Sequence, residues 1–281
     1  MSRTKNKTIM SLTLFIIAAV LLCSLSINAG NARAGSGTDE PEIIKLGNWT
    51  EADLDKVMKD SSESGSTGKQ IDFISEKFLD TPYKDSTLTG DLNTQEVFTI
   101  DLEGMDCFTY IDYVEAMRLS ESFPQFEEEL KKVRYKKGNI NFQDRNHFFS
   151  DWTVYNKNYV RDLTREIGGE KTRELLKNLN RKKDGTVFLP GIPVTERTIY
   201  YIPSAEIDKT VTDKLNTGDY VGIYTDIEGL DVSHTGIIIK KEGGIFLRHA
   251  SSRENNKKVV DEDLIEYIQN KPGLVIYRPV N

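Results

Sequence analysis

The chain has 281 residues, of which 38% are hydrophobic, and its formal net charge at neutral pH is −7. These values fit one globular domain with a sizeable core. They disfavour a nucleic-acid-binding protein, which needs a basic surface for phosphates, and a protein held on anionic lipid by a basic stripe.

Residues 1–34 have the order of a secretory signal peptide. Three basic residues precede an apolar run from 9 to 22, and small residues follow up to Ala34. The run has about 14 residues, fewer than the about 20 that a membrane-spanning helix needs, and no later segment is apolar enough to span. We therefore expect cleavage near Ala34 or Ala29 and export to the periplasm or extracellular space. The leader carries four basic and no acidic residues, so the mature net charge is about −11.

The sequence contains two cysteines, Cys23 and Cys107. Acylation of Cys23 would make the protein a lipoprotein, but Leu22 stands where such a signal needs a small residue, so simple export is the favoured interpretation. After cleavage only Cys107 remains, and no intramolecular disulfide can form. An unpaired cysteine in an exported protein is either a small buried hydrophobe or a functional thiol.

The N-terminal part of the mature chain is expected to be helical. Residues 35–47 lack periodicity and are interpreted as a flexible tether, followed by a single domain over 48–281. Thr50 and Asp53 have the spacing of a helix cap, and the apolar residues that follow have helical spacing. A second amphipathic helix is expected from Lys69 to Leu79.

Cys107 lies between an expected strand and an expected helix. Residues 97–102 alternate between apolar and polar, which is typical of a half-buried strand. After the turn at 103–106, apolar residues at helical spacing predict a helix that begins at or near Cys107. A helix N-terminus favours a thiolate and offers free N–H groups to a negatively charged oxygen. The position therefore suits a nucleophile.

The second half of the chain changes from helical to strand patterns. Residues 124–183 are dominated by charged segments with helical spacing and are interpreted as a helical insertion. From Val187 onward strands are expected, at 198–202, 220–225, 234–240, 245–249 and 274–277, with a helix from Val260 to Gln269 between the last two. Helices followed by a mostly antiparallel sheet indicate the α+β class.

Two of the three histidines lie on one expected hairpin. His234 begins one strand, and His249 ends the next strand after a short turn that contains glycine. Both then lie toward the same end of the hairpin, where one imidazole can hydrogen-bond the other. We interpret His234 as the base toward Cys107 and His249 as the group that orients it. The small residues Thr235 and Gly236 are expected to leave room for a substrate.

Other interpretations of these residues remain open. A histidine near a strand end is more often a boundary residue than a catalyst. Cysteine and two histidines can also bind zinc, but no His-x-x-x-His or Cys-x-x-Cys spacing is present, so we expect no metal and no other cofactor. Arg145 and His147 lie beside an aromatic cluster, where they either pack at a boundary or line a substrate cleft.

In these motifs the sequence resembles the NlpC-type papain-like superfamily of bacterial cell-wall cysteine hydrolases, and most closely its N-acetylmuramoyl-L-alanine amidase-like branch. The resemblance covers residues 71–278 and rests on five segments in order: Tyr83, 105–109, 145–152, 234–237 and 249–251. It implies a papain-like fold with the nucleophilic cysteine at a helix N-terminus, packed on the sheet. It also implies that Cys107, His234 and His249 are catalytic, that Tyr83 helps to form the oxyanion site and that Asp106 borders the substrate pocket.

The residues after Cys107 depart from the usual pattern of these hydrolases. Endopeptidases of the superfamily have Ser and Gly there, whereas this chain has Phe108 and Thr109. The departure favours cleavage between N-acetylmuramic acid and L-alanine over cleavage of the γ-D-glutamyl to diamino-acid bond in the stem peptide. We expect an exported, monomeric amidase that acts on muropeptides or peptidoglycan fragments. A stem-peptide endopeptidase and a non-catalytic wall-binding protein are the alternatives.

Overall fold

The computed structural model describes residues 41–280. The expected signal peptide, its cleavage site and Cys23 lie outside these residues. Within them, no helix has the length and apolar character needed to cross a membrane.

The described chain contains short helices and ten strands. The α-helices are α1 (Glu51–Ser62), α2 (Thr67–Glu76), α3 (Cys107–Arg118), α4 (Phe123–Arg134), α5 (Phe149–Tyr155), α6 (Thr164–Gly168), α7 (Lys209–Thr212) and α8 (Leu264–Ile268). The strands are β1 (Glu42–Lys45), β2 (Phe98–Asp101), β3 (Val160–Asp162), β4 (Arg173–Leu179), β5 (Thr195–Pro203), β6 (Tyr220–Tyr224), β7 (Val232–Lys241), β8 (Gly244–Ala250), β9 (Val259–Asp263) and β10 (Gly273–Pro279).

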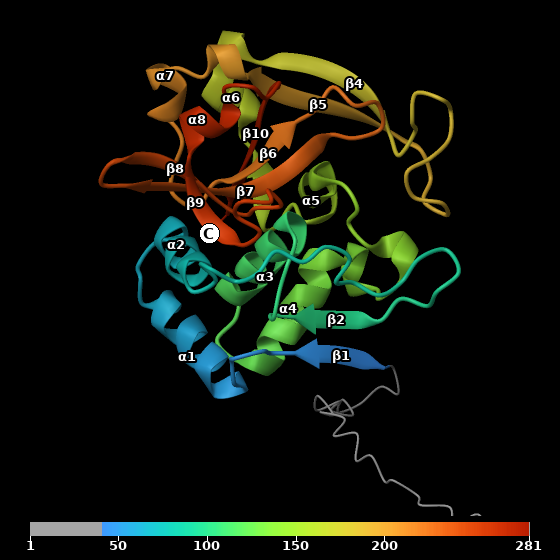
Figure 1. Cartoon of the computed structure of the whole chain (residues 1–281), viewed down its shortest axis with the longest axis vertical. Coiled ribbons are helices and arrows are strands. Elements are labelled where there is room, and N and C mark those ends of the chain that lie inside the picture. The colour runs from blue at the N-terminus through green and yellow to red at the C-terminus, as the bar shows by residue number, and fades with distance from the viewer. Residues whose placement is uncertain (1–40, 281) are drawn as a thin grey trace, which may run out of the picture. The chain divides into compact units, whose positions relative to one another are not determined.

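An eight-stranded antiparallel sheet separates two sets of helices. Its strand order is β4-β5-β10-β6-β7-β8-β9, with β3 paired to β10. Helices α1 to α4 lie on one side of the sheet, and α6 to α8 lie on the other (Figure 1). A separate pair, β1 and β2, is parallel. The expected combination of helices with a mostly antiparallel sheet is confirmed.

Strand β7 shows how the sheet supports a core on both faces. Ile237 and Ile239 belong to the apolar cluster that includes the residues of α3, whereas Ile238 belongs to a second cluster with Leu264 and Ile268 of α8. Successive side chains of a strand point to opposite faces, so one strand contributes to both clusters. The sheet thus fixes α3 and α8 relative to the same strand.

Arg248 of β8 joins the sheet to helix α2. Its side chain is 2% exposed and donates to Asp261 Oδ1 at 2.7 Å, to Asp72 Oδ1 at 2.9 Å and to Ser75 Oγ at 3.0 Å. A buried guanidinium needs such complete pairing, because an unpaired buried charge is strongly destabilising. The contacts hold β8 and β9 in place beside the helical side of the molecule.

The expected local signals at α1 to α3 are confirmed. Thr50 and Asp53 form a reciprocal capping box at the start of α1. Helix α2 runs from Thr67 to Glu76, close to the expected range. Helix α3 begins at Cys107, with Asp106 as its N-cap.

Two expectations for the N-terminal half are wrong. The segment Glu42–Lys45, placed in a tether, is strand β1, because it pairs residue by residue with β2 and its Ile44 packs against the core. Strand β2 is buried on both faces rather than on one, since Thr99 and Asp101 are also covered. Long-range pairing and packing decide both features, and the local pattern does not contain them.

The expected helical insertion over 124–183 is helical only in part. It contains α4, α5 and α6, but Arg173–Leu179 is strand β4 at the edge of the sheet. The leucines at 175, 176 and 179 have helix-like spacing, yet β4 pairs along its whole length with β5. A continuous ladder with a distant strand outweighs the weak local preference.

The helix expected from Val260 to Gln269 is also wrong in its first half. Residues 259–263 form β9, which pairs antiparallel with β8, and only Leu264–Ile268 is helical. Asp263 caps that short helix through Glu266 N. Strand β9 places the carboxylate of Glu262 beside His249 of β8.

Candidate active site

Cys107 is the first residue of α3, at the point where the helix meets β7. Its carbonyl oxygen accepts a hydrogen bond from Thr235 Oγ1 at 2.7 Å, so the strand residue next to His234 touches the helix start. Within the described chain Cys107 is a free cysteine of intermediate exposure. Thr235 therefore contacts the helix start, whereas the sequence had suggested that it leaves room for substrate.

Backbone N–H groups at the N-terminus of α3 already have hydrogen-bond acceptors within the chain. Asp106 Oδ1 accepts from the backbone N–H groups of Phe108, at 2.8 Å, and Thr109, at 2.7 Å. Thr109 Oγ1 in turn accepts from Asp106 N at 3.0 Å, which completes a capping box. Two of the N–H groups expected to receive an oxyanion are thus already bonded, which leaves that of Cys107.

The environment of the thiol favours its protonated form. Burial, followed by the nearby Asp106 carboxylate, raises the pKa of Cys107 to about 11, although hydrogen bonds from Thr235 and from the Cys107 N–H act in the opposite direction. The expected stabilisation of a thiolate by the helix start is therefore outweighed. A base must remove the proton during any attack by this sulfur.

His234 and His249 make the contact expected from their positions on the hairpin. His234 Nε2 lies 2.6 Å from His249 Nδ1, and the two rings are perpendicular. Gly236 of β7 lies against His249: a Cβ on Gly236 would lie 3.0 Å from His249 Cβ and 2.6 Å from Leu247 Cδ1. Gly236 thus makes room for His249, whereas the sequence had suggested room for a substrate.

Glu262 extends this pair of imidazoles to a third group. Its Oε2 lies 2.8 Å from His249 Nε2, and its Oε1 accepts from Arg253 Nη1 at 2.9 Å and from Asn256 Nδ2 at 3.3 Å. Tyr267 of α8 packs edge-on against His249, with ring centroids 5.0 Å apart. The sequence analysis missed Glu262 because it assigned this segment to a helix.

Both imidazoles are neutral near pH 7. Burial, and then Lys271 and Arg253, lower the pKa of His234 to about 4. Burial, and then His234, lower the pKa of His249 to about 2. A neutral His234 whose Nε2 is bonded to His249 keeps Nδ1 for another partner. Such a ring can accept a proton.

Tyr83 lies beside the same helix start. Its backbone bridges Met105, and its N–H donates to Lys257 O at 2.8 Å, so the segment is held between α3 and the edge of β9. Burial, and then the negative charge that Cys107 carries as a thiolate, raise the pKa of Tyr83 to about 12. The phenol is therefore protonated and near the sulfur, as a donor to an oxyanion must be.

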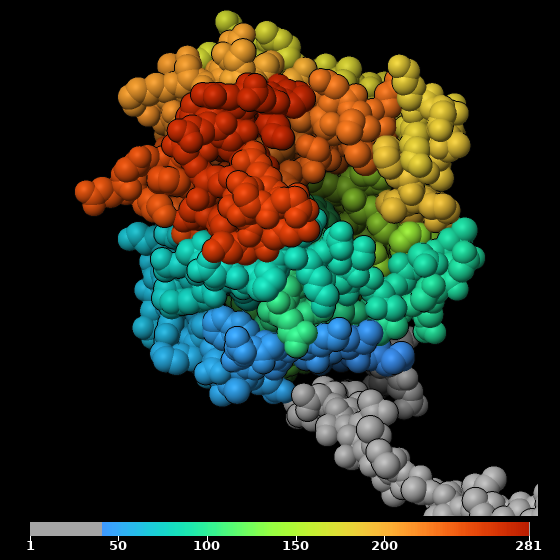
Figure 2. Space-filling view, viewed as in Figure 1, coloured from blue at the N-terminus to red at the C-terminus, as the bar shows by residue number. Residues whose placement is uncertain are grey.

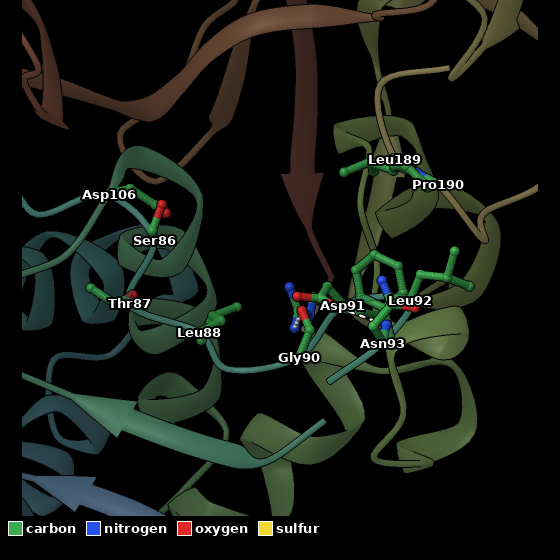
Figure 3. Close-up of a pocket in the computed structure, with 12 residues that line it drawn as sticks. Ser86, Thr87, Leu88, Gly90, Asp91, Leu92, Asn93, Asp106, Leu189 and Pro190 are labelled. Atoms are coloured by element: carbon green, nitrogen blue, oxygen red, sulfur yellow. Dashed lines mark hydrogen bonds between the residues drawn. The ribbon is translucent and has the colours of Figure 1, made fainter. Parts of the chain in front are cut away.

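An open cleft of about 640 Å³ reaches Asp106, the residue before Cys107, and its lining residues do not include Cys107, His234 or His249. Asp106 and Ser86 lie at one end and Leu189 and Pro190 on the opposite wall (Figure 3). In the space-filling view the surface is hollowed between the teal, green and yellow segments to which these residues belong (Figure 2). Asp106 therefore lines this cleft.

Arg145 and His147 differ in their relation to the cleft. Arg145 lines the cleft, but its guanidinium is paired with the buried carboxylate of Glu96 and donates to Gly90 O at 3.3 Å. These contacts hold the segment from Gly90 to Glu96 in place. His147 is not among the lining residues, and its Nε2 lies 2.7 Å from Phe142 O. The alternative of a boundary residue describes His147 better.

The described residues offer no evident metal cage. Among residues 41–280, no group of three or more His, Cys, Asp or Glu side chains has an arrangement that could hold a metal ion. Both ring nitrogens of His249 are engaged in hydrogen bonds.

A family model described as AmiA-like, N-acetylmuramoyl-L-alanine amidase-like, matches residues 73–274. The chain belongs to this family. The matched range contains Cys107, both site histidines and Glu262, and membership in the amidase-like family supports a hydrolase. A comparison with curated proteins gave no match.

Several solved structures are similar to this amidase-like chain. A protein from Legionella pneumophila has a TM-score of 0.69 and 25% identity, over 82% of this chain and 94% of that one. An N-acetylmuramoyl-L-alanine amidase from Bacteroides uniformis has a TM-score of 0.64 and 26% identity, over 77% of this chain and all of that one. A Bacteroides fragilis protein, named as a candidate xylanase, has a TM-score of 0.58 and 26% identity, over 73% of this chain and 98% of that one.

Proposed function

We propose that this protein is a peptidoglycan hydrolase that cleaves the amide between N-acetylmuramic acid and L-alanine, with Cys107 as its nucleophile. The observation that carries the proposal is the arrangement of Cys107 at a helix start, in contact with the strand of His234, whose ring is bonded to His249. Membership in the amidase-like family supports the choice of an amide substrate. A papain-like fold of the NlpC type is part of this proposal.

In the first step His234 Nδ1 takes the proton of the Cys107 thiol as the sulfur attacks the amide carbonyl carbon. The negative oxygen of the tetrahedral intermediate accepts from the Cys107 N–H and from the Tyr83 hydroxyl. The protonated His234 then gives its proton to the nitrogen of L-alanine as the carbon–nitrogen bond breaks. The products of this step are the free stem peptide and a thioester on Cys107.

In the second step water resolves the thioester. His234 takes a proton from water, the hydroxyl oxygen attacks the thioester carbonyl, and the sulfur leaves and recovers the proton from His234. The carboxylic acid of the muramic acid is released and loses its proton to bulk water, and the thiol and imidazole return to their neutral forms. Neutral resting groups match the raised pKa of Cys107 and the lowered pKa of His234.

The choice of scissile bond rests on the family rather than on Phe108 and Thr109. Thr109 completes the helix cap, and Phe108 packs against Trp152 with ring centroids 6.1 Å apart. Both residues therefore have local structural roles. The amidase-like family and the Bacteroides uniformis neighbour support the bond between sugar and peptide.

We also propose that the protein acts after export, as the leader over residues 1–34 suggests. Substrate would then be met as muropeptides or peptidoglycan fragments outside the cytoplasm. Detection of the processed protein in the culture medium or periplasm, with its new N-terminus sequenced, tests this part.

Digestion of defined muropeptides followed by mass analysis tests the function. Wild-type protein should release an intact stem peptide that begins with L-alanine, and Cys107→Ala should lose at least about 10⁴-fold in kcat because no nucleophile remains. Cys107→Ser, which keeps the size of the side chain, is the matched control for packing. Circular dichroism should show that both variants fold.

Three outcomes would contradict the proposal. Fragments cut within the stem peptide indicate an endopeptidase. Peptidoglycan binding that is unchanged in Cys107→Ala, with no product from the wild type, indicates a wall-binding protein. Full activity in Cys107→Ala would remove the thiol from the mechanism.

A further inference from the structure

The carboxylate of Glu262 has a fixed orientation at the end of the histidine pair. Arg253 Nη1 and Asn256 Nδ2 both point at its Oε1, at 2.9 and 3.3 Å. These nitrogens can only donate. Oε1 is therefore an acceptor, and Oε2 faces His249 Nε2 at 2.8 Å. A carboxylate accepts at both oxygens, so the His249 Nε2 must carry the hydrogen.

The direction of the next hydrogen bond follows from this one. His249 is buried, with 1% of its surface exposed, and its pKa is lowered to about 2, so the ring is neutral and carries one hydrogen. With that hydrogen on Nε2, Nδ1 is an acceptor, and His234 Nε2, 2.6 Å away, must donate. His234 is neutral as well. Its Nδ1 then has no hydrogen and presents a lone pair.

We propose that Glu262 is a positioning residue that sets the direction of this hydrogen-bond chain, so that His234 presents an unprotonated Nδ1 to the Cys107 thiol. This inference rests on the proposed function, because the direction matters for catalysis only if His234 takes the thiol proton. Glu262 lies two imidazoles away from the sulfur and acts through them.

Replacement of Glu262 by glutamine should reverse the direction of both hydrogen bonds in this chain. The donors Arg253 and Asn256 require the amide oxygen at the Oε1 position, so the amide NH₂ occupies the Oε2 position and faces His249 Nε2. Two donors cannot face each other, so His249 must move its hydrogen to Nδ1. His234 then accepts at Nε2 and carries its hydrogen on Nδ1. The ring toward the thiol can no longer take a proton.

The first test is kinetic. Glu262→Gln should lower kcat by about 10²- to 10³-fold, with KM within about twofold. In a serine-protease triad, replacement of the aspartate by asparagine forces the wrong tautomer on the catalytic histidine and costs about 10⁴-fold in kcat. We expect less here because Glu262 contacts His249 and not His234 itself. The size and shape of the side chain are preserved, so the melting temperature should stay near that of the wild type. Unchanged kcat in Glu262→Gln would overturn the proposal.

A rescue separates this role from a structural one. Arg253→Met and Asn256→Ala remove the donors that fix the amide, so glutamine can turn its oxygen to His249. The triple variant Glu262→Gln, Arg253→Met, Asn256→Ala should recover at least about tenfold in kcat over Glu262→Gln alone, which reflects coupling between neighbouring residues. A purely structural role predicts further loss instead. The pair Arg253→Met, Asn256→Ala with Glu262 retained should lose less than Glu262→Gln, because a carboxylate cannot donate.

The second test needs no turnover. Nitrogen NMR of ¹⁵N-labelled histidine distinguishes ring nitrogens with and without a hydrogen, and the chain has only three histidines. His147→Gln assigns the third signal. The wild type should have hydrogens on Nε2 of both His234 and His249, and Glu262→Gln should have them on Nδ1 of both.

The two tests fail separately. If the wild type cleaves no muropeptide, the proposed function fails, and the NMR experiment still decides whether Glu262 sets the tautomers. If the enzyme is active but Glu262→Gln leaves both tautomers unchanged, the inference about Glu262 is wrong while the function stands.

Discussion

The residues proposed for chemistry lie on regular elements, whereas the residues that line the cleft lie mostly on loops. Cys107 begins α3, and His234, His249 and Glu262 lie on three adjacent strands whose side chains are linked by hydrogen bonds of 2.6 and 2.8 Å. The cleft walls come from residues 86–93 and from the loop at Leu189. Figure 1 shows these loops beside the sheet rather than within it.

Because of this difference, we expect substitutions in the two regions to change different kinetic constants. A sheet ladder holds neighbouring side chains within tenths of an ångström, which proton transfer requires. Loops vary more readily and commonly determine what a scaffold binds. Changes on β7 to β9 should therefore act on kcat, and changes on the cleft loops should act on KM.

The largest effect among these is expected at His249. His249→Ala should lower kcat by about 10³-fold, because His234 loses the partner that orients it, whereas His249→Asn should keep part of the activity through its amide oxygen. Steady-state kinetics with a fluorescent muropeptide measure both variants. Insensitivity of kcat to His249→Ala would remove His249 from the mechanism.

A smaller effect is expected at the cleft wall. Leu189→Ser removes an apolar contact from the cleft and should raise KM by about three- to tenfold with kcat within about twofold. Leu176→Ser is the matched control, because Leu176 is 57% exposed on β4 and does not line this cleft. A loss confined to kcat in Leu189→Ser would contradict the division between hairpin and loops.

The smallest expected effect concerns the pH at which kcat/KM falls on the acidic side of the pH profile. The pKa of His234 is lowered to about 4, so its neutral, base form persists below the ordinary histidine value of about 6.5. The ratio kcat/KM should fall only as the pH drops through about 4. A limb near 6.5 in a pH profile would show that His234 is not the essential base in this state.

Acid also acts on folding, so this profile needs a structural control. All three histidines have lowered pKa values, and the unfolded chain takes up protons below about 6.5 while the folded chain does not. Stability is therefore present above that pH and is lost progressively below it. Circular dichroism at each pH separates loss of the base from loss of the fold.

Local signals in the sequence were sufficient for α3 and the histidine hairpin. A run of apolar residues at helical spacing placed Cys107 at a helix start, and a short turn with glycine placed His234 and His249 at the same end of two strands. Both features depend on residues close together in the chain. Both features can therefore be predicted without knowledge of the rest of the fold.

Distant contacts were decisive elsewhere. Residues 173–179 have helix-like leucine spacing but pair with β5, and residues 259–263 have an acidic pattern but pair with β8. The surroundings of the thiol are another example, since burial and Asp106 raise its pKa although a helix start alone would lower it.

By itself the sequence determined that Cys107 begins a helix and that His234 and His249 lie on one hairpin, because helix starts and tight hairpins are specified by neighbouring residues. Only the tertiary structure decided that Glu262 completes the chain of hydrogen bonds and that Gly236 makes room for His249. The alignment of β8 with β9 sets both the distance and the face on which these side chains meet. Register between strands is a property of the whole sheet, so no local pattern contains it.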